Sequence, residues 1–337
     1  MQIMAGAVQG GAEAFFERLT LALARRGLSQ VAVIRKNEKR ARKLESAGVP
    51  VVQLPFGGPL DLWTPFAIAR EAKRFKPGVA LAWMNRAAQK MPRLNAVRAG
   101  RLGGFYNLKY YRRCDHLIGN TQGIVNYMIA EGWPSERAHY LPNFVDPPAA
   151  ESAPRASFDT PEDAPLVVAL GRLHPNKAFD VFIDALAQAP GIWAWLAGEG
   201  PERAALEARA QEKGVAARLR FLGWRDDVPA LVKAADIFVC PSRHEPLGNV
   251  VLEAFAAAKP VIAAASQGPS ELIENGANGI LVPVDDASAL AGAIRALAAD
   301  RARAARLAQA GYATYSRSFT EDKVVDAYMA FFEKVTR

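Results

Sequence analysis

The stretch His244-Glu245-Pro246-Leu247-Gly248-Asn249-Val250-Val251-Leu252-Glu253 decides how the second half of this chain folds. It follows the apolar run 236–240 and leads into the Ala-rich segment 255–258, a pattern that predicts strand, tight loop and helix. Pro246 suits a helix entry because its missing N–H would be unpaired there, and Gly248 permits close backbone approach to a ligand. Glu245 lies in the predicted loop, and Glu253 lies about one turn inside the predicted helix.

The start of that helix is a predicted anion site. The backbone N–H groups of Gly248, Asn249 and Val250 would be free there, with the positive end of the helix dipole behind them. Glu245 and Glu253 would lie on either side of the anion. A ligand with hydroxyls, then phosphates, then more hydroxyls fits this order, and a nucleotide sugar is such a ligand.

A second motif, Gly171-Arg172-Leu173-His174-Pro175-Asn176-Lys177, follows the apolar run 166–170. Arg172 offers a planar fork to phosphate oxygens and Lys177 a point charge, so the two cations would stabilise a diphosphate leaving group as it gains charge. Two surface cations near a loop are the alternative explanation. The presence of Glu245 and Glu253 in the same half of the chain favours the functional interpretation.

Apolar runs alternate with helical stretches through the second half, as βαβ units of a parallel sheet require. We expect strands over 166–170, 192–197, 219–222, 237–240, 261–264 and 279–282, and helices over 178–189, 201–213, 228–234, 250–257 and 287–299. Ligands of doubly wound sheets bind beyond the carboxyl ends of the strands. Both motifs fall at such ends.

The first half shows the same alternation less cleanly. Its predicted strands are 2–5, 31–35, 49–54, 79–83 and 116–119, and a helix is predicted over 12–26. The proline-rich segment 142–165 reads as a linker. The closing segment 320–335 has apolar residues at the spacing of an amphipathic helix.

Length and composition are those of a two-domain globular protein. The chain has 337 residues, of which 50% are hydrophobic and 23% charged, and no apolar run approaches the ~18–20 residues that cross a bilayer. Cys114 and Cys240 lack a metal or redox spacing and fit a reducing compartment, so we expect a cytoplasmic protein.

Charge is distributed unevenly between the two halves. Residues 1–150 hold 22 Lys and Arg against 10 Asp and Glu, a balance of +12, whereas residues 151–337 hold 20 against 24, a balance of −4. This asymmetry indicates that the first half faces something anionic, such as the inner membrane surface or a phosphorylated lipid acceptor. Cations that merely solvate helices are the alternative.

Glu245 and Glu253 have seven residues between them and follow a strand that ends in Pro241-Ser242. Together with the 171–177 motif, they resemble the signature of the retaining glycosyltransferases of family 4. The resemblance implies that Arg172 and Lys177 bind the donor diphosphate, Glu253 the ribose and Glu245 the transferred sugar. It extends from about residue 165 to the C-terminus and is weaker over the first half.

The same resemblance implies the GT-B fold, an α/β architecture of two Rossmann-like doubly wound parallel-sheet domains facing across a cleft. The expected domains are 1–148, which would bind the acceptor, and 149–318, which would bind the nucleotide sugar, with the terminal helix 319–337 packing back on the first. Gly10 and Gly11 match a glycine pair of the family near the phosphate or acceptor, and Leu222 a region near the base. Turn chemistry and strand-end packing explain these residues equally well.

Two catalytic features common in glycosyltransferases are missing from the sequence. The stretch 83–90 holds neither the Asp nor the His that the family often places near the acceptor, so no acceptor-side base is assigned. There is no Asp-x-Asp pair either, and we predict neither a metal nor a further cofactor. In a front-face mechanism the departing phosphate oxygen would itself accept the proton of the acceptor.

The segment 101–113 mixes aromatic and basic residues. It would form either a helix at a membrane interface or a helix with its aromatics in the core and its cations outside. RNA binding has no recognisable module behind it, so no nucleic-acid partner is expected.

The sequence therefore predicts retaining transfer from a nucleoside diphosphate sugar to a glycolipid or lipopolysaccharide-type saccharide, with peripheral membrane contact. A non-catalytic nucleotide-sugar sensor or assembly subunit is the alternative from another class. A GT-B sugar-nucleotide epimerase is less favoured, because it needs acid–base residues that the first half lacks.

Overall fold

The computed structural model describes residues 1–8, 10–58, 60–145 and 151–337. These residues form two compact units, one of Met1–Phe144 with Glu321–Arg337 and one of Val145–Thr320. The domain boundary predicted after residue 148 lies outside the described residues. The chain therefore contributes its last helix to the first unit, and the predicted terminal helix over 319–337 corresponds to α13 (Glu321–Thr336).

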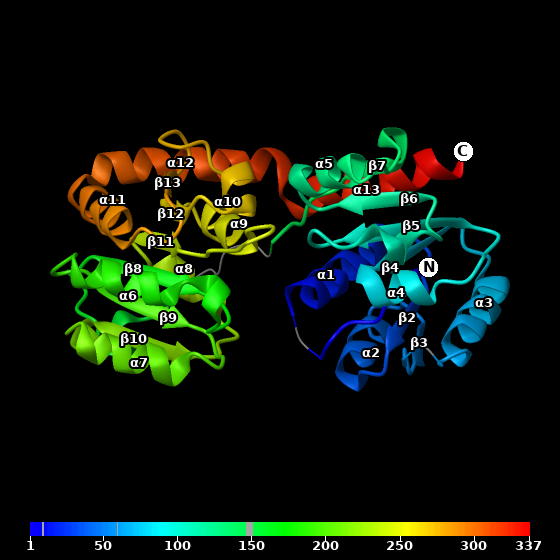
Figure 1. Cartoon of the computed structure of the whole chain (residues 1–337), viewed down its shortest axis with the longest axis horizontal. Helices are drawn as coiled ribbons and strands as arrows, with labels where there is room; N and C mark the ends of the chain where they lie inside the picture. The colour runs from blue at the N-terminus through cyan, green and yellow to red at the C-terminus, as the bar shows by residue number, and fades with distance from the viewer. Residues whose placement is uncertain (9, 59, 146–150) are drawn as a thin grey trace. The chain divides into compact units, whose positions relative to one another are not determined.

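The first unit contains a seven-stranded, all-parallel sheet in the order β3-β2-β1-β4-β5-β6-β7 (Figure 1). Its strands are β1 (Gln2–Met4), β2 (Ala32–Arg35), β3 (Val51–Leu54), β4 (Val79–Trp83), β5 (Val97–Leu102), β6 (His116–Gly119) and β7 (Ala138–Tyr140). Besides α13, its helices are α1 (Gly11–Arg25), α2 (Glu38–Glu45), α3 (Trp63–Phe75), α4 (Met84–Lys90) and α5 (Gln122–Ala130). All five strands predicted for this half are confirmed.

The helix considered for 101–113 is wrong. Arg101 and Leu102 are the last residues of β5, and only a short 3-10 turn, Leu108–Tyr111, follows. Gly103 and Gly104 separate the two elements, and glycine is a poor helix former. The aromatic residues of this segment are consequently spread between the core and the surface: Tyr111 is fully buried, whereas Phe105 is 41% exposed.

The second unit contains a six-stranded, all-parallel sheet in the order β10-β9-β8-β11-β12-β13. Its strands are β8 (Leu166–Leu170), β9 (Trp193–Ala197), β10 (Leu219–Gly223), β11 (Ile237–Cys240), β12 (Val261–Ala264) and β13 (Ile280–Val282). Its helices are α6 (Phe179–Ala187), α7 (Arg203–Glu212), α8 (Val228–Ala234), α9 (Asn249–Ala256), α10 (Gln267–Leu272), α11 (Ala287–Ala299) and α12 (Arg301–Ser318). The strands predicted for this half are confirmed to within one residue.

Strand order in the second unit follows the Rossmann pattern, in which the direction of winding reverses between the first and fourth strands. Here those strands are β8 and β11, which are hydrogen-bonded neighbours. Ligands of doubly wound sheets bind at this reversal, beyond the carboxyl ends of the two strands. The fold therefore places the loops after β8 and β11 at the preferred ligand position.

Continuous apolar runs form these strands because both faces of the sheet are covered by helices (Figure 1). Val167 of β8 packs in one buried cluster with residues of α6, α7 and α11, and Val168 packs in the other with residues of α8, α9 and the end of α12. Side-chain caps start the last two helices: Asp286 accepts from the N–H of Ala289, and Asp300 from that of Arg303, each at 2.8 Å.

A buried arginine attaches α13 to the first sheet. Arg101 of β5 is 2% exposed, and its guanidinium lies 4.8 Å and 4.7 Å from the ring centres of Phe15 and Trp83. Its Nε donates to the hydroxyl of Tyr328 in α13 at 2.8 Å, and its Nη2 donates to the side-chain carbonyl of Asn143. Aromatic faces and hydrogen bonds thus stabilise the charge.

We expect Arg101→Met to lower the free energy of unfolding by ~2–4 kcal/mol, because the buried polar groups of Tyr328 and Asn143 would lose their donor. Arg112→Met is the matched control, since Arg112 is exposed in the same segment. Urea unfolding monitored by tryptophan fluorescence measures both. Equal stability of the two variants would contradict the role given to Arg101.

Candidate functional site

The two motif loops contact each other at the carboxyl ends of β8 and β11. The backbone N–H of His244 donates to the carbonyl of Asn176 at 3.2 Å. Arg243 donates to the carbonyl of Pro175 at 2.8 Å. Two segments that are almost seventy residues apart in sequence therefore form one continuous surface at the reversal of strand order.

An ion pair joins the predicted site residues of the two loops. The ammonium group of Lys177 donates to Oε2 of Glu245, and both side chains are largely buried, with 23% and 12% of their surface exposed. Burial alone would lower the pKa of Lys177, but the charge and hydrogen bond of Glu245 outweigh it, and the charge of Glu253 adds to them, so the pKa is raised. Lys177 is therefore a cation held by the carboxylate of Glu245, with the charge of Glu253 near enough to favour its ionised form.

Glu245 also organises the start of α9. Its Oε1 accepts from the N–H of Gly248 at 3.3 Å, and its backbone carbonyl accepts from the N–H of Gly268 at 2.7 Å. The Gly248 N–H, predicted to be free, is thus engaged through a long hydrogen bond. Gly248 has φ 81°, which favours glycine, and Asn249 and Val250 follow as the half-buried first residues of the helix.

Glycines without side chains let the loops after β8 and β9 touch through their backbones. A Cβ on Gly198 would lie 1.8 Å from the carbonyl oxygen of Gly171, and one on Gly200 would lie 2.3 Å from that of Leu173. The N–H of Leu173 donates to the carbonyl of Glu199 at 3.0 Å. Only glycine fits at 198 and 200, so these residues determine the shape of the motif loop.

Arg172 is exposed in the loop after β8. Within the described ranges, its guanidinium makes no hydrogen bond or ion pair. The structure thus joins two of the four predicted side chains, Lys177 and Glu245, in direct contact, and the charge of Glu253 acts on Lys177 from α9. Leu222, the residue predicted near the base, is half-buried at the end of β10 and packs against the core.

Arg243 supports the site but was not predicted from the sequence. Its guanidinium pairs with Asp180 at 2.6 Å and with Asp285 at 2.5 Å, which ties the loop after β11 to the start of α6 and to the loop before α11. Its position two residues before Glu245 was a signal, but its partners lie 63 and 42 residues away. Pairs so distant in sequence cannot be read from a local pattern.

Gly10 and Gly11 belong to the first unit. The position of Glu13 explains why residue 10 is a glycine. The carboxylate of Glu13 is buried and accepts from the N–H of Ala7 at 2.7 Å. A Cβ on Gly10 would lie 2.4 Å from that carboxylate. Gly10 therefore makes room for Glu13, and Gly11 is the first residue of α1.

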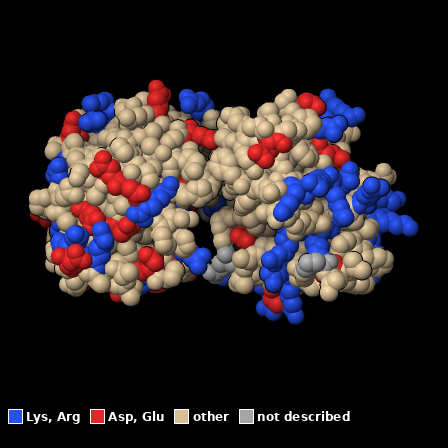
Figure 2. All heavy atoms as spheres, in the orientation of Figure 1, with Lys and Arg blue, Asp and Glu red and all other residues tan. Residues whose placement is uncertain are grey.

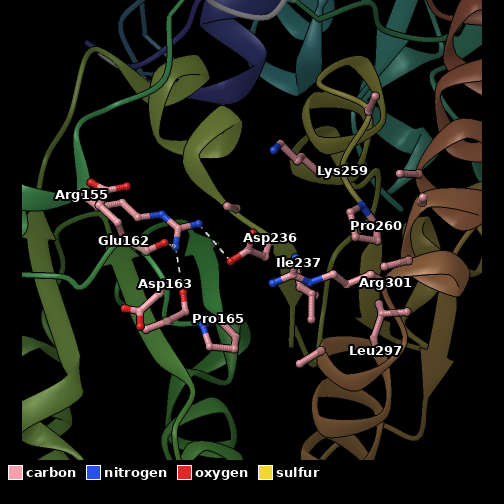
Figure 3. A pocket seen from close by; sticks show the side chains of 17 residues that line it. Arg155, Glu162, Asp163, Pro165, Asp236, Ile237, Lys259, Pro260, Leu297 and Arg301 are labelled. Atoms are coloured by element: carbon pink, nitrogen blue, oxygen red, sulfur yellow. Dashed lines mark hydrogen bonds and ion pairs between the residues drawn. The ribbon is translucent and has the colours of Figure 1, made fainter.

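A cavity of about 400 Å³ lies at the other edge of the second sheet, near the amino ends of β8, β11 and β12. Figure 3 shows Arg155 paired with Asp236 on one side, and Lys259 and Arg301 on the other. None of the predicted site residues lines it. The cavity is thus distinct from the surface formed by the motif loops.

Two features are absent from the residues that the structure describes. No helix among them has the length and apolarity needed to cross a membrane. No group of three or more His, Cys, Asp or Glu among them is arranged to hold a metal ion.

Comparison with known proteins identifies the family. Residues 151–314 match the model of "Glycosyl transferases group 1". The chain is 39% identical to the lipopolysaccharide core biosynthesis glycosyltransferase LpsE of Rhizobium meliloti, over 95% of both chains. It belongs to the group 1 glycosyltransferases.

LpsD of the same organism, also named a lipopolysaccharide core biosynthesis glycosyltransferase, is 35% identical over 97% of this chain and 96% of its own. Among solved structures, Anabaena Alr3699/HepE in complex with UDP covers 99% of both chains with a TM-score of 0.86 at 23% identity. That likeness establishes the fold. The group 1 glycosyltransferase chain thus has the two parallel-sheet domains of the GT-B type that its sequence predicted.

We expect Gly198→Ala to destabilise the second unit by ~2–4 kcal/mol. The added Cβ would collide with the backbone of Gly171, and the φ of Gly198, 144°, is one that side chains rarely adopt. Gly292→Ala is the control: it lies inside α11 with open space around it, and alanine there should stabilise the helix by ~0.5–1 kcal/mol. Thermal unfolding of the two variants measures the difference. Similar behaviour of both would refute the close backbone packing.

Proposed function

We propose that this glycosyltransferase moves a sugar from a nucleoside diphosphate sugar to a lipopolysaccharide-type saccharide or glycolipid, as a retaining enzyme of family 4. The observation that carries the proposal is the Lys177–Glu245 pair, at the reversal of strand order in the second sheet and within the electrostatic influence of Glu253. The similarity to LpsE and LpsD supports the acceptor class.

Lys177 and Arg172 would bind the diphosphate of the donor. Lys177 is already positioned by Glu245, so little side-chain entropy remains to be lost when a phosphate oxygen approaches. Arg172 is exposed, and its guanidinium can turn to a second phosphate oxygen. The N–H groups of Gly248, Asn249 and Val250 at the start of α9 would donate hydrogen bonds to the phosphate. The phosphate would replace Glu245 as the acceptor of the long hydrogen bond from Gly248.

The two glutamates would bind hydroxyl groups on either side of the diphosphate. Glu253 is half-buried in α9, where most of its neighbours are buried apolar residues, and ribose hydroxyls would offer its carboxylate polar contacts. Glu245 would hold the transferred sugar. A carboxylate at that place also favours the positive charge that develops at the anomeric carbon.

Retention follows from a front-face substitution. The bond between the anomeric carbon and the phosphate oxygen breaks, and the acceptor oxygen bonds to the same face of that carbon. The acceptor proton passes to the departing phosphate oxygen, so the step needs no base from the stretch 83–90. We propose that fixed cations serve the leaving group without a metal ion, and that the only small molecule required is the donor itself.

The acceptor side of the proposal rests on charge. The first half of the chain carries the balance of +12, and in Figure 2 Lys and Arg form a nearly continuous band over the N-terminal unit, with few Asp and Glu among them. Phosphorylated saccharides and anionic lipids are the ligands that such a surface attracts. We therefore propose that the protein works in the cytoplasm, at the inner membrane face, and not on nucleic acid.

A nucleotide-sugar sensor or assembly subunit is the second candidate. A protein that only binds the donor would need the same four side chains, Arg172, Lys177, Glu245 and Glu253. Incubation with nucleoside diphosphate sugars, UDP-glucose first, and bacterial lipopolysaccharide core as acceptor separates the two. The enzyme transfers labelled sugar to the acceptor. A sensor gives an increase in unfolding temperature with the donor but no labelled product.

We expect Lys177→Ala to lower the rate of sugar transfer by ~10²–10³-fold, the usual effect of removing one group that stabilises developing negative charge. Lys213→Ala is the control, because Lys213 lies at the end of α7 and pairs only with the adjacent Glu212 among the ion pairs described. Rates are measured with the donor at saturation. An unchanged rate for Lys177→Ala would rule out its proposed role.

A further inference from the structure

Four large apolar side chains stand exposed where α3 begins. Leu60 is 95% exposed, Leu62 80%, Trp63 52% and Phe66 58%. Trp63 and Phe66 contact each other, with ring centres 5.6 Å apart. Single exposed apolar residues are common on soluble proteins, but a contiguous group of this size marks an interaction surface. We refer to these four residues as the apolar tip.

Hydrogen bonds hold the loop that carries the tip. The carboxylate of Asp61 accepts from the N–H of Gly57 at 2.7 Å and from the N–H and hydroxyl of Thr64 at 2.9 and 2.6 Å. Lys90 of α4 donates to the carbonyls of Gly58 and Asp61 at 2.7 and 2.8 Å. The hydrogen bond from Thr64, above all, lowers the pKa of Asp61, so this anchor stays ionised near neutral pH.

The exposed face of α3 continues the tip with cations. Trp63, Phe66, Arg70 and Lys73 follow one another at helical spacing, and all four are exposed. The guanidinium of Arg70 lies 5.9 Å from the ring centre of Trp63. Buried Ala67, Ile68 and Ala72 form the opposite face, which packs in the core of the first unit.

Negative charge in this segment is directed away from the surface. Asp61 has only 10% of its side chain exposed and is occupied by the loop. Glu71 has 11% exposed and pairs with Arg74 at 2.7 Å. What the segment presents outward is therefore apolar at one end and positive along the helix.

We infer that the apolar tip inserts into the interfacial layer of an anionic lipid bilayer, while Arg70 and Lys73 contact lipid phosphates. Apolar side chains followed by cations on one helix face are the pattern of segments that lie in a membrane interface. An anionic bilayer complements both features: its acyl boundary receives the tip, and its charge attracts the basic N-terminal unit (Figure 2). A protein partner would have to match the same combination.

This inference deepens the proposed function, since a membrane-anchored acceptor would explain such a contact. The contact itself does not depend on sugar transfer. It also replaces the segment 101–113 as the membrane candidate, because Arg101 and Tyr111 of that segment are buried.

Vesicle binding by the full chain tests the inference. Sedimentation is compared for phosphatidylethanolamine vesicles with and without phosphatidylglycerol. The wild type should bind the anionic vesicles and bind the neutral ones weakly, with affinity falling as salt rises. Leu60→Ser with Leu62→Ser, or Trp63→Ser with Phe66→Ser, should weaken binding about tenfold or more, because inserted apolar area is lost.

Arg70→Gln with Lys73→Gln should also weaken binding, by about tenfold, and should reduce its dependence on salt. Tyr312→Ser is the control, since Tyr312 is 46% exposed on α12 of the second unit. Unchanged unfolding temperatures establish that the variants are folded. A double variant that does not fold is replaced by the single variants Leu60→Ser and Leu62→Ser, because Leu60 and Leu62 are the most exposed residues of the apolar tip.

Several outcomes overturn the inference. These are no binding of the wild type to anionic vesicles, equal binding of the tip variants, or self-association in sedimentation velocity that the tip variants abolish. The last would assign the tip to a protein contact. Failure of sugar transfer with intact vesicle binding would instead count against the proposed function alone, so the two failures are distinguishable.

Discussion

The ion pair between Lys177 and Glu245 is the interaction on which the candidate site depends. It joins the loop after the first strand of the second sheet to the loop after the fourth. Taking both groups out of water is costly, but the charge of Glu245 and its hydrogen bond outweigh the effect of burial on Lys177, whose pKa is raised. The result is a lysine that remains charged and is positioned before any ligand arrives.

Such an arrangement has a consequence for donor binding. A diphosphate that approaches Lys177 competes with Glu245 for the same ammonium group, so part of the attraction is spent in weakening the existing pair. However, the ammonium group of Lys177 is already fixed in place when the leaving group gains charge. Such preorganised charge stabilises a transition state. We therefore expect the pair to contribute more to turnover than to donor affinity.

Backbone packing positions the pair. The loops after β8 and β9 touch through Gly171, Gly198 and Gly200 without intervening side chains. Arg243 then ties the loop after β11 to Asp180 and Asp285. Close backbone contact between these loops therefore fixes the place of the charged side chains.

The second sheet was predictable because its strands are buried on both faces. Runs such as 166–170 and 237–240 consist of apolar residues throughout, and the structure forms strands over these residues. In contrast, β5 contains Arg98, Gly100 and Arg101, which interrupt the pattern. Arg101 contacts Phe15, Trp83 and Tyr328. Contacts between residues so distant in sequence cannot be predicted from a local pattern.

The same limit applies to the sites. The positions of Lys177, Glu245 and Glu253 after β8, after β11 and in α9 were predictable because each residue follows or enters a recognisable element. Their support by Arg243 depends on distant partners and was not. Nor could periodicity distinguish the exposed Leu60 and Leu62 from core leucines, because an apolar residue in a loop looks the same in sequence whether it is buried or displayed.

Hydrogen–deuterium exchange with a nucleoside diphosphate, UDP first and other bases if UDP leaves the unfolding temperature unchanged, tests the central claim most directly. The account predicts slower exchange of backbone amides in the loop 171–178 and across 244–253 when the ligand is bound, with no change around Arg155 and Lys259. Protection confined to the cavity lined by those two residues would contradict it.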